Sequence, residues 1–306
     1  MGTSKTDIPF LSEPDVSSVL AMSELIPAMG QALIDYSEGL ISQPDRQMLP
    51  VAKSGGFFGA MPAVGDAVGV KLVNFVPGNV QFDLPTHLAL ILLFRPETGE
   101  PLAIMDGRLI TEMRTAAVSA AIVKKIAPAK PKALAVLGAG LQARTHIEAL
   151  SEVRTFDEIR VWARSPSKGQ DFADEVGAIA LSAEDAVRGA DVVVTATAAK
   201  EPILQGAWLK PGAIVAAVGW SSRDGRELDE EAMKNVVIVE SRSGTEKESG
   251  NIRGAGAEIS AEAGEILSGA KMIESGSTVT SDSIGMAAED VASAQLVWRR
   301  FQEQHS

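Results

Sequence analysis

A glycine-rich turn that follows a short apolar run is the feature that most constrains the fold. Residues 133–137 (ALAVL) are all apolar, and Gly138, Gly140 and Ala143 follow with the spacing G-x-G-x-x-A. Between a strand and a helix, the two glycines allow a tight turn and a close approach to a pyrophosphate, and the alanine allows close helix–strand packing. We therefore expect a dinucleotide to bind here; a tight turn without a ligand is the alternative. The expected contacts are Gly138, Ala139, Gly140, Leu141 and Gln142.

The residues after this turn alternate between apolar runs and helical segments. Strands are predicted at 159–162, 192–194, 213–218 and 236–239, and helices at 142–153, 167–176 and 183–188. Fully apolar strands separated by helices indicate a parallel sheet that is covered on both faces. The fold class is therefore predicted to be α/β, with a Rossmann-type parallel-sheet domain.

The first 115 residues have a different pattern. A helix is predicted from about residue 23 to residue 39, and β-like segments at 57–61, 68–76, 86–94 and 101–105 are separated by turns rich in Gly and Pro. Further helices are predicted at 108–127 and over the last residues, 285–306. We expect an α+β segment with an antiparallel sheet.

Charge and composition narrow the classes of partner. The chain has 28 Lys and Arg against 40 Asp and Glu, which gives a formal net charge of −12. Such a surface repels nucleic acid and anionic membranes, although a local basic pocket can still hold a small anion. With no cysteine and three histidines, disulfides, thiolate sites and a multi-histidine metal centre are not expected. We expect a cytoplasmic protein that uses no metal.

The end of the second predicted strand bears on the choice of cofactor. An acidic residue there typically binds the ribose 2′-hydroxyl of NAD, but residues 162–168 (WARSPSK) contain none. Arg164, Ser165 and Lys168 instead suit a 2′-phosphate, so NADP(H) is the preferred cofactor, with NAD(H) possible. In the alternative reading these cations are solvated surface charges. Thr197 and Gly219, which follow two later strands, complete the expected cofactor-binding set.

Three cations of the first domain lie in apolar or turn-rich segments: Arg46, Lys71 and Arg114. Lys71 is the most conspicuous, because a lysine inside a valine-rich strand is costly unless its ammonium reaches a cleft or a partner. An edge-strand lysine that extends to water is the other reading.

Five segments together resemble the ornithine cyclodeaminase/mu-crystallin family, in the family's order and from about residue 20 to 300. They are residues 71–79 (KLVNFVPGN), 106–117 (DGRLITEMRTAA), 138–143 (GAGLQA), 226–229 (RELD) and 285–290 (GMAAED). The resemblance implies a homodimer with two domains in each chain. Residues 1–115, completed by the helix at 285–306, would form the substrate-binding and dimerisation domain, and residues 116–284 the dinucleotide-binding domain.

The resemblance also implies roles for the cations. By motif position, Arg46, Lys71 and Arg114 match the family's substrate-carboxylate and catalytic cations. Bidentate arginines orient a carboxylate, and a desolvated lysine beside two arginines has a lowered pKa and can donate or accept a proton. His87 either lines the same cleft or is a structural histidine.

One position departs from the cyclodeaminase pattern. Where ornithine cyclodeaminases have an aspartate that handles the substrate amine, this chain has Ser221, as do mu-crystallin-like ketimine reductases. We expect Ser221 to hold the substrate nitrogen or a water. The predicted function is therefore an NAD(P)H-dependent reductase of carboxylate-bearing cyclic ketimines, such as Δ1-pyrroline-2-carboxylate and Δ1-piperideine-2-carboxylate, which gives proline or pipecolate.

Three alternatives stay open at this stage. An ornithine cyclodeaminase would release ammonia without net consumption of NADPH, and an amino-acid dehydrogenase would use an open-chain keto acid with ammonia or an amine. The third alternative is a non-enzymatic, NADPH-dependent binder of small ligands.

Overall fold

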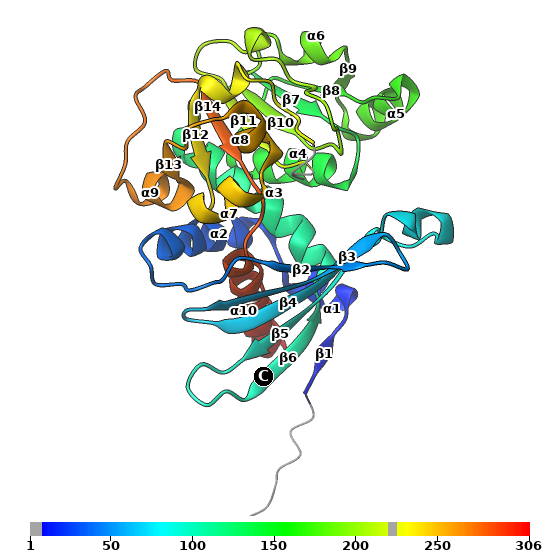
Figure 1. Ribbon diagram of the computed structural model, residues 1–306, viewed down its shortest axis with the longest axis vertical. Coiled ribbons are helices and arrows are strands. Elements are labelled where there is room, and N and C mark those ends of the chain that lie inside the picture. Colours follow the sequence, from blue (N-terminus) through cyan, green and yellow to red (C-terminus); the bar gives the residue numbers. More distant parts are fainter. Residues whose placement is uncertain (1–7, 220–224) are drawn as a thin grey trace, which may run out of the picture. The chain divides into compact units, whose positions relative to one another are not determined.

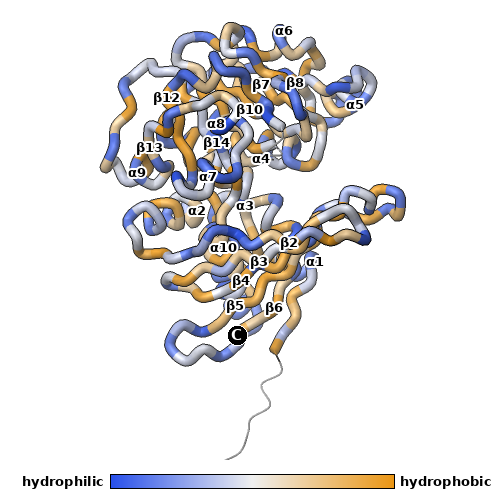
Figure 2. The backbone as a smooth tube through the Cα atoms, in the orientation of Figure 1, coloured by the Kyte–Doolittle hydropathy of each residue, from blue (hydrophilic) through white to orange (hydrophobic). Residues whose placement is uncertain are grey.

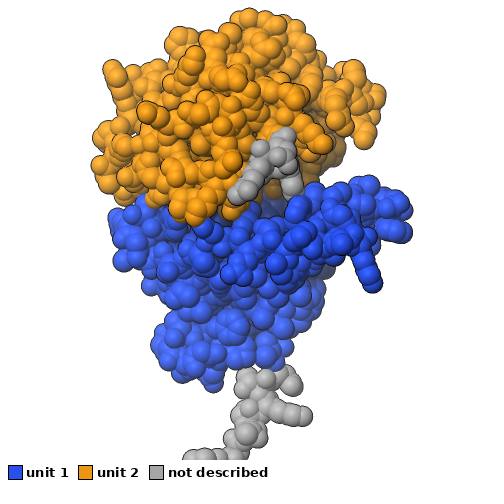
Figure 3. All heavy atoms as spheres, in the orientation of Figure 1, with its two compact units in different colours: residues 1–114, 286–306 blue, residues 115–285 orange. Residues whose placement is uncertain are grey.

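A computed structural model describes residues 8–219 and 225–306 of the chain. These residues belong to two compact units, which Figure 3 colours separately. Unit 1 comprises residues 1–114 and 286–306, and unit 2 comprises residues 115–285. Each internal bound (114, 115, 285 and 286) differs by one residue from the domain boundary expected from the sequence.

Unit 1 is built on a mixed sheet (Figure 1). Neighbouring strands pair antiparallel, as expected, except that the first strand pairs in parallel with the last. That parallel strand corrects the expectation of a purely antiparallel sheet. In spatial order the strands of the described residues are β1 (Phe10–Leu11), β6 (Pro101–Asp106), β5 (His87–Phe94), β4 (Val68–Phe75), β3 (Gly56–Val64) and β2 (Gln47–Val51).

The two faces of this sheet have different surroundings. Helix α10 (Ala287–His305) packs against β3, β4 and β5, and it also packs against α2 (Met22–Ser37) and α1 (Glu13–Val19). Side chains alternate between faces, so the buried row Met61, Lys71, Ile91 and Met105, which lie opposite one another in register, points to this helical layer. Leu88 and Leu90 of β5 point to the other face and are each 40% exposed.

Unit 2 contains a parallel sheet with the helices and turns of a Rossmann-type fold (Figure 1). In spatial order its described strands are β13 (Ala261–Glu262), β12 (Val236–Val239), β14 (Val279–Asp282), β11 (Ile214–Ala217), β10 (Val192–Thr195), β7 (Ala133–Leu137), β8 (Glu158–Trp162) and β9 (Ile179–Ala180). The strands β7, β10 and β12 are hydrophobic segments in Figure 2, and residues of all three lie in the core.

Helices and single turns connect these strands. The described helices that lie wholly in unit 2 are α4 (Leu141–Val153), α5 (Pro166–Val176), α6 (Ala183–Val187), α7 (Arg242–Glu248), α8 (Gly250–Ala255) and α9 (Ala263–Ser268). Short 3-10 turns in unit 2 are η2 (Gly206–Trp208) and η3 (Ala232–Lys234), while η1 (Pro77–Phe82) lies between β4 and β5 of unit 1. Helix α3 (Arg108–Ile126) begins in unit 1 and continues into unit 2, so it carries the chain from one unit to the other.

Among the described residues, no single helix has the length and apolar composition of a membrane span. Helices α1 and α2 pass that test only when they are taken together, and the chain bends by 91° between them.

Candidate active site

The glycine-rich turn lies between β7 and α4, at the point where the strand order of the sheet reverses. From β7 the chain proceeds to β8 on one side, and later places β10 on the other side. Gly138 has a φ of 140°, and a Cβ there would lie 2.5 Å from the carbonyl oxygen of Ala196, directly after β10. Only glycine fits this turn, which lies where ligands bind in open α/β sheets.

Gly140 makes the beginning of α4 accessible. It is the N-cap residue of this 13-residue helix, and no heavy atom of the other described residues, its two chain neighbours aside, lies within 4 Å of the position that a Cβ would occupy. The first turn of a helix has backbone N–H groups without intrahelical partners and a partial positive charge. Open space in front of such a turn fits the pyrophosphate of a dinucleotide.

The segment after β8 carries the expected selectivity residues. Ser165 is the N-cap of α5 and accepts a hydrogen bond from the backbone N–H of Lys168 at 3.5 Å. The side chains of Arg164 and Lys168 are exposed. Their exposure leaves both cations accessible to a phosphate. The same exposure is expected of cations that only contact solvent.

Thr197 and Gly219, the other two expected cofactor contacts, share one buried partner, Glu227. One carboxylate oxygen of Glu227 accepts from the backbone N–H of Thr197 at 2.7 Å and from its hydroxyl at 2.6 Å. The other accepts from the backbone N–H of Gly219 at 3.0 Å. Glu227 lies in the RELD segment but is not among the functional residues expected from the sequence.

In unit 1, Lys71 and Arg114 meet at one aspartate. The ammonium of Lys71, which is 2% exposed, lies 2.6 Å from Oδ2 of Asp290. Arg114 donates from Nε to Oδ1 of Asp290 at 3.1 Å, and from Nη1 to Oε2 of Glu289 at 2.7 Å. Two expected functional cations are thus joined by acidic residues that the sequence analysis left without a role.

Three features hold the acidic pair beside the cations. Glu289 and Asp290 lie in the first turn of α10, where the helix dipole favours negative charge. The backbone N–H of Ala288 donates to Oε1 of Gln43 at 2.9 Å. On the opposite strand, a Cβ at Gly69 would lie 3.1 Å from Val291, so this glycine allows α10 to approach β4 closely.

Burial and charge change the pKa values in this cluster. Burial is the main cause that lowers the pKa of Lys71 to about 8; Arg114 and Arg46 lower it further and Asp290 opposes them. Burial alone would raise the pKa of Asp290, but Lys71 and Arg114 hold it below its usual range. The cluster therefore contains a lysine that exchanges its proton near neutral pH.

His87 and Arg46 complete the expected substrate-binding set. Burial, followed by the charges of Lys71 and Arg114, lowers the pKa of His87 to about 4, so its imidazole is neutral at pH 7. Arg46, which directly precedes β2, is close enough for its charge to affect Lys71. The structure thus groups Arg46, Lys71, His87 and Arg114, whereas Ser221 lies outside the described residues.

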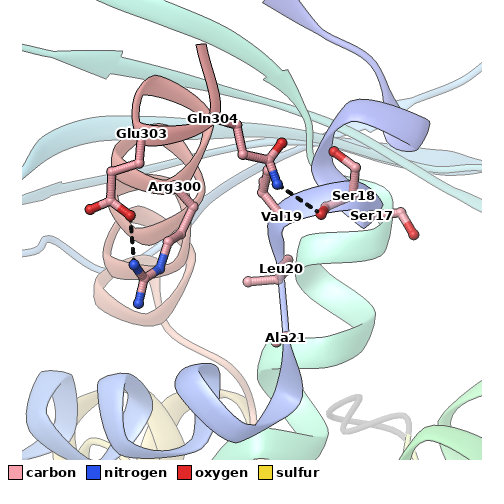
Figure 4. A pocket seen from close by; sticks show the side chains of 8 residues that line it. All are labelled: Ser17, Ser18, Val19, Leu20, Ala21, Arg300, Glu303 and Gln304. Carbon is pink, nitrogen blue, oxygen red and sulfur yellow. Dashed lines mark hydrogen bonds and ion pairs between the residues drawn. The ribbon is translucent and has the colours of Figure 1, made fainter. Parts of the chain in front are cut away.

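A surface cavity of about 370 Å³ lies elsewhere in unit 1 (Figure 4). Its described lining comes from residues 17–21, which are the end of α1 and the link to α2, and from Arg300, Glu303 and Gln304 of α10. Arg300 is paired there with Glu24 and, at 2.6 Å, with Glu303. The Arg300 side chain is 41% exposed and Lys71 is 2% exposed, so solvent and salt screen the charge of Arg300 far more. This cavity therefore fits a carboxylate substrate less well than the Lys71 cluster does.

The missed acids could have been found by asking what neutralises the buried cations. A lysine in an apolar strand needs a counter-ion, and Glu289 and Asp290 are the acidic part of the GMAAED segment. Acidic residues are common in the first turn of a helix, however, so this pair does not by itself indicate a functional site.

The chain is similar to known proteins over nearly its whole length. The model of the ornithine cyclodeaminase/mu-crystallin family matches residues 7–305. The ketimine reductase mu-crystallin of Mus musculus is 45% identical over 300 residues, which cover 94% of this chain and 96% of that protein. The chain is also similar to two solved structures. One is Thermococcus litoralis Δ1-pyrroline-2-carboxylate reductase in complex with NADH and L-proline, with a TM-score of 0.90, 33% identity and coverage of 97% of this chain and 98% of that one. The other is an archaeal alanine dehydrogenase dimer with bound NAD, with a TM-score of 0.91, 30% identity and coverage of 98% and 97%. The chain therefore belongs to the ornithine cyclodeaminase/mu-crystallin family.

Proposed function

We propose that the protein is an NAD(P)H-dependent reductase of small cyclic ketimines with a carboxylate on the C=N carbon. The observation that carries this proposal is Lys71, a buried ammonium that is paired with Asp290 and has its pKa lowered to about 8 by burial and by the charges of Arg114 and Arg46. The relatives support the reaction class, because one is a ketimine reductase and another is a pyrroline-2-carboxylate reductase that holds NADH and proline. Δ1-Pyrroline-2-carboxylate and Δ1-piperideine-2-carboxylate are the proposed substrates, and proline and pipecolate the products.

The residues of unit 1 bind the substrate and supply a proton. Arg46 and Arg114 attract the substrate carboxylate and so fix the orientation of the neighbouring imine. Lys71 donates its proton to the imine nitrogen, which makes the carbon more electrophilic, and regains a proton from solvent. When bound, NAD(P)H supplies the hydride that adds to the imine carbon and is oxidised to NAD(P)⁺. Neutral His87 offers the substrate a hydrogen bond without adding another charge.

NADP(H) is the cofactor that the residues after β8 favour. No acidic side chain occurs in residues 162–168, while Arg164, Ser165 and Lys168 offer two cations and a hydroxyl. A 2′-phosphate carries negative charge and accepts hydrogen bonds, so it gains more from these groups than a 2′-hydroxyl does.

The proposed assembly is a homodimer in which a second copy covers the face of the unit 1 sheet that carries Leu88 and Leu90. Val70 and Leu92 lie opposite each other on this face, as do Leu72 and Leu90. An apolar sheet face of this kind, rich in leucine, is typical of surfaces that are buried by association. Light scattering of the purified protein would give twice the chain mass of 32.1 kDa.

The proposal is tested by NADPH oxidation against a panel of substrates. Cyclic ketimines with five- and six-membered rings should be reduced, whereas ornithine should neither oxidise NADPH nor release ammonia. Pyruvate with ammonia forms the third arm, because the archaeal alanine dehydrogenase is also similar to this chain. Turnover of ornithine or pyruvate at a higher kcat/KM than that of both ketimines would overturn the proposal.

A further inference from the structure

We infer that Glu227 is a positioning residue that shapes the cofactor-binding edge of unit 2; the inference rests on the proposed function. Its side chain is buried, at 2% exposure. Within the described part of unit 2, four donors point to its two oxygens: the N–H and hydroxyl of Thr197, the hydroxyl of Thr195 at 2.7 Å, and the N–H of Gly219. One carboxylate thus holds together the segments that follow β10 and β11.

These segments lie at the carboxyl ends of adjacent strands. Thr195 is the last residue of β10 and pairs with Ala217, the last residue of β11. Thr197 and Gly219 each come two residues after their strand. The Gly138 turn adjoins the same edge through its contact with Ala196. A dinucleotide crosses such an edge, with its adenosine half on the β7–β8 side and its other half on the β10–β11 side.

A carboxyl group fits this position better than an amide does: burial raises the pKa of Glu227, and the hydrogen bonds from Thr197, Thr195 and Gly219 oppose that rise. Both backbone N–H groups, those of Thr197 and Gly219, can only donate, and they meet different oxygens of Glu227. The Thr197 hydroxyl accepts from the N–H of Ala199 at 3.2 Å, so its proton is directed to Glu227. A glutamine at this position would direct its NH₂ group at one of the two N–H groups and leave a buried donor unsatisfied.

The backbone around Glu227 is fixed as well. The N–H groups of Glu227 and Leu228 donate to the side-chain oxygen of Asn251 at 2.9 and 3.1 Å. The carbonyl of Glu227 accepts from the N–H of Leu204 at 3.0 Å. Gly219 also fits this arrangement closely, because a Cβ there would lie 2.3 Å from the Glu227 carboxyl group. The backbone of Glu227 is therefore fixed, and its side chain can hold in place the residues that are expected to contact the cofactor.

The test compares Glu227→Gln with Glu231→Gln, the same chemical change at an exposed residue of the same segment. Calorimetry measures Kd for NADPH and for 2′,5′-ADP, which represents the adenosine half. We expect Glu227→Gln to weaken NADPH binding about tenfold, from the loss of one buried hydrogen bond, and to change 2′,5′-ADP binding less than twofold. Glu231→Gln should bind both ligands as the unchanged protein does.

The outcomes separate this inference from the proposed function. If the unchanged protein binds neither NADPH nor NADH, the proposed function fails. If it binds them and Glu227→Gln binds NADPH equally well, or loses both ligands to the same extent, the positioning role is wrong. Should Glu227→Gln not fold, Thr195→Val removes one hydroxyl donor at almost constant volume, and a smaller weakening confined to NADPH is expected. Unchanged or equally weakened binding by Thr195→Val would overturn the inference.

Discussion

Replacing Asp290 with asparagine should move the alkaline limb of the pH profile of kcat/KM to lower pH. Asp290 raises the pKa of Lys71, while burial, Arg114 and Arg46 lower it, and the balance is a pKa of about 8. An adjacent opposite charge changes the pKa of a group by roughly one to three pH units. Without the carboxylate charge, 2.6 Å from Nζ, the pKa of Lys71 should therefore fall to between about 5 and 7.

The effect on the rate follows from the protonated fraction of Lys71. At pH 8 about half of the lysine is protonated when its pKa is about 8. With a pKa of about 6, only about 1% is protonated, so kcat/KM at pH 8 should fall roughly 50-fold, and by much less at pH 5. Ketimine ionisation contributes equally to both profiles, so the difference between them reports the enzyme.

The measurement is kcat/KM for Δ1-piperideine-2-carboxylate from pH 5 to pH 10. Glu289→Gln is the matched control, because Glu289 lies in the same helical turn and pairs with Arg114, while Lys71 pairs with Asp290. Its alkaline limb should stay near pH 8. Circular dichroism confirms that Asp290→Asn folds, since loss of one partner from a buried ion pair is destabilising. A folded Asp290→Asn protein with an unmoved alkaline limb would refute the assignment of this limb to Lys71.

Three further predictions concern Lys71, Arg164 and Asp282. Lys71→Ala should lower kcat/KM by about 10²-fold or more and leave Kd for NADPH, measured by calorimetry, within about twofold; near-normal turnover would exclude the proton-donor role. Arg164→Asp should lower the NADPH-to-NADH ratio of kcat/KM by about tenfold or more, and an unchanged ratio would show that Arg164 does not contact the 2′-phosphate. Burial raises the pKa of Asp282 from 3.8 to about 6, so its carboxyl stabilises the fold when protonated, and this contribution is lost as the pH rises through about 6. The free energy of unfolding is measured with urea at pH 4 and at pH 7, for the unchanged protein and for Asp282→Asn. The decrease from pH 4 to pH 7 should be about 2 kcal/mol larger in the unchanged protein. Equal decreases in the two proteins would contradict the raised pKa.

The strands with continuous apolar sequence could be predicted, and β14 could not. Residues 133–137 and 236–239 are apolar throughout and became β7 and β12 at their expected bounds. Strand β14 lies between β11 and β12, but Thr280, Ser281 and Asp282 make up most of it. These polar groups find partners only in the folded chain: the Thr280 hydroxyl donates to the carbonyl of Ala232, and Asp282 accepts from Asn251. A strand whose polar side chains are satisfied by distant residues has no local signature.

In the candidate site, the cations could be predicted from the sequence and their acidic partners could not. The cations were conspicuous because a charge in an apolar strand is expensive, so Lys71 could be selected from its sequence neighbours alone. Its counter-ion is more than 200 positions away, at Asp290, and Glu227 meets Thr197 from a separate loop. Neither acid is unusual in its local sequence. Only the packing of α10 on the sheet, and of the RELD segment beside β10, brings them to their partners.

The central claim is that the protein reduces a cyclic ketimine, and the stoichiometry of the reaction tests it most directly. The protein is incubated with a measured amount of Δ1-pyrroline-2-carboxylate and excess NADPH, and NADP⁺, proline and ammonia are quantified at completion. One NADP⁺ and one proline for each imine consumed, with no ammonia released, is the predicted result. A parallel incubation contains ornithine in place of the imine. Proline and one equivalent of ammonia from ornithine, with no net NADPH oxidation and no turnover of the imine in the first incubation, would contradict the claim.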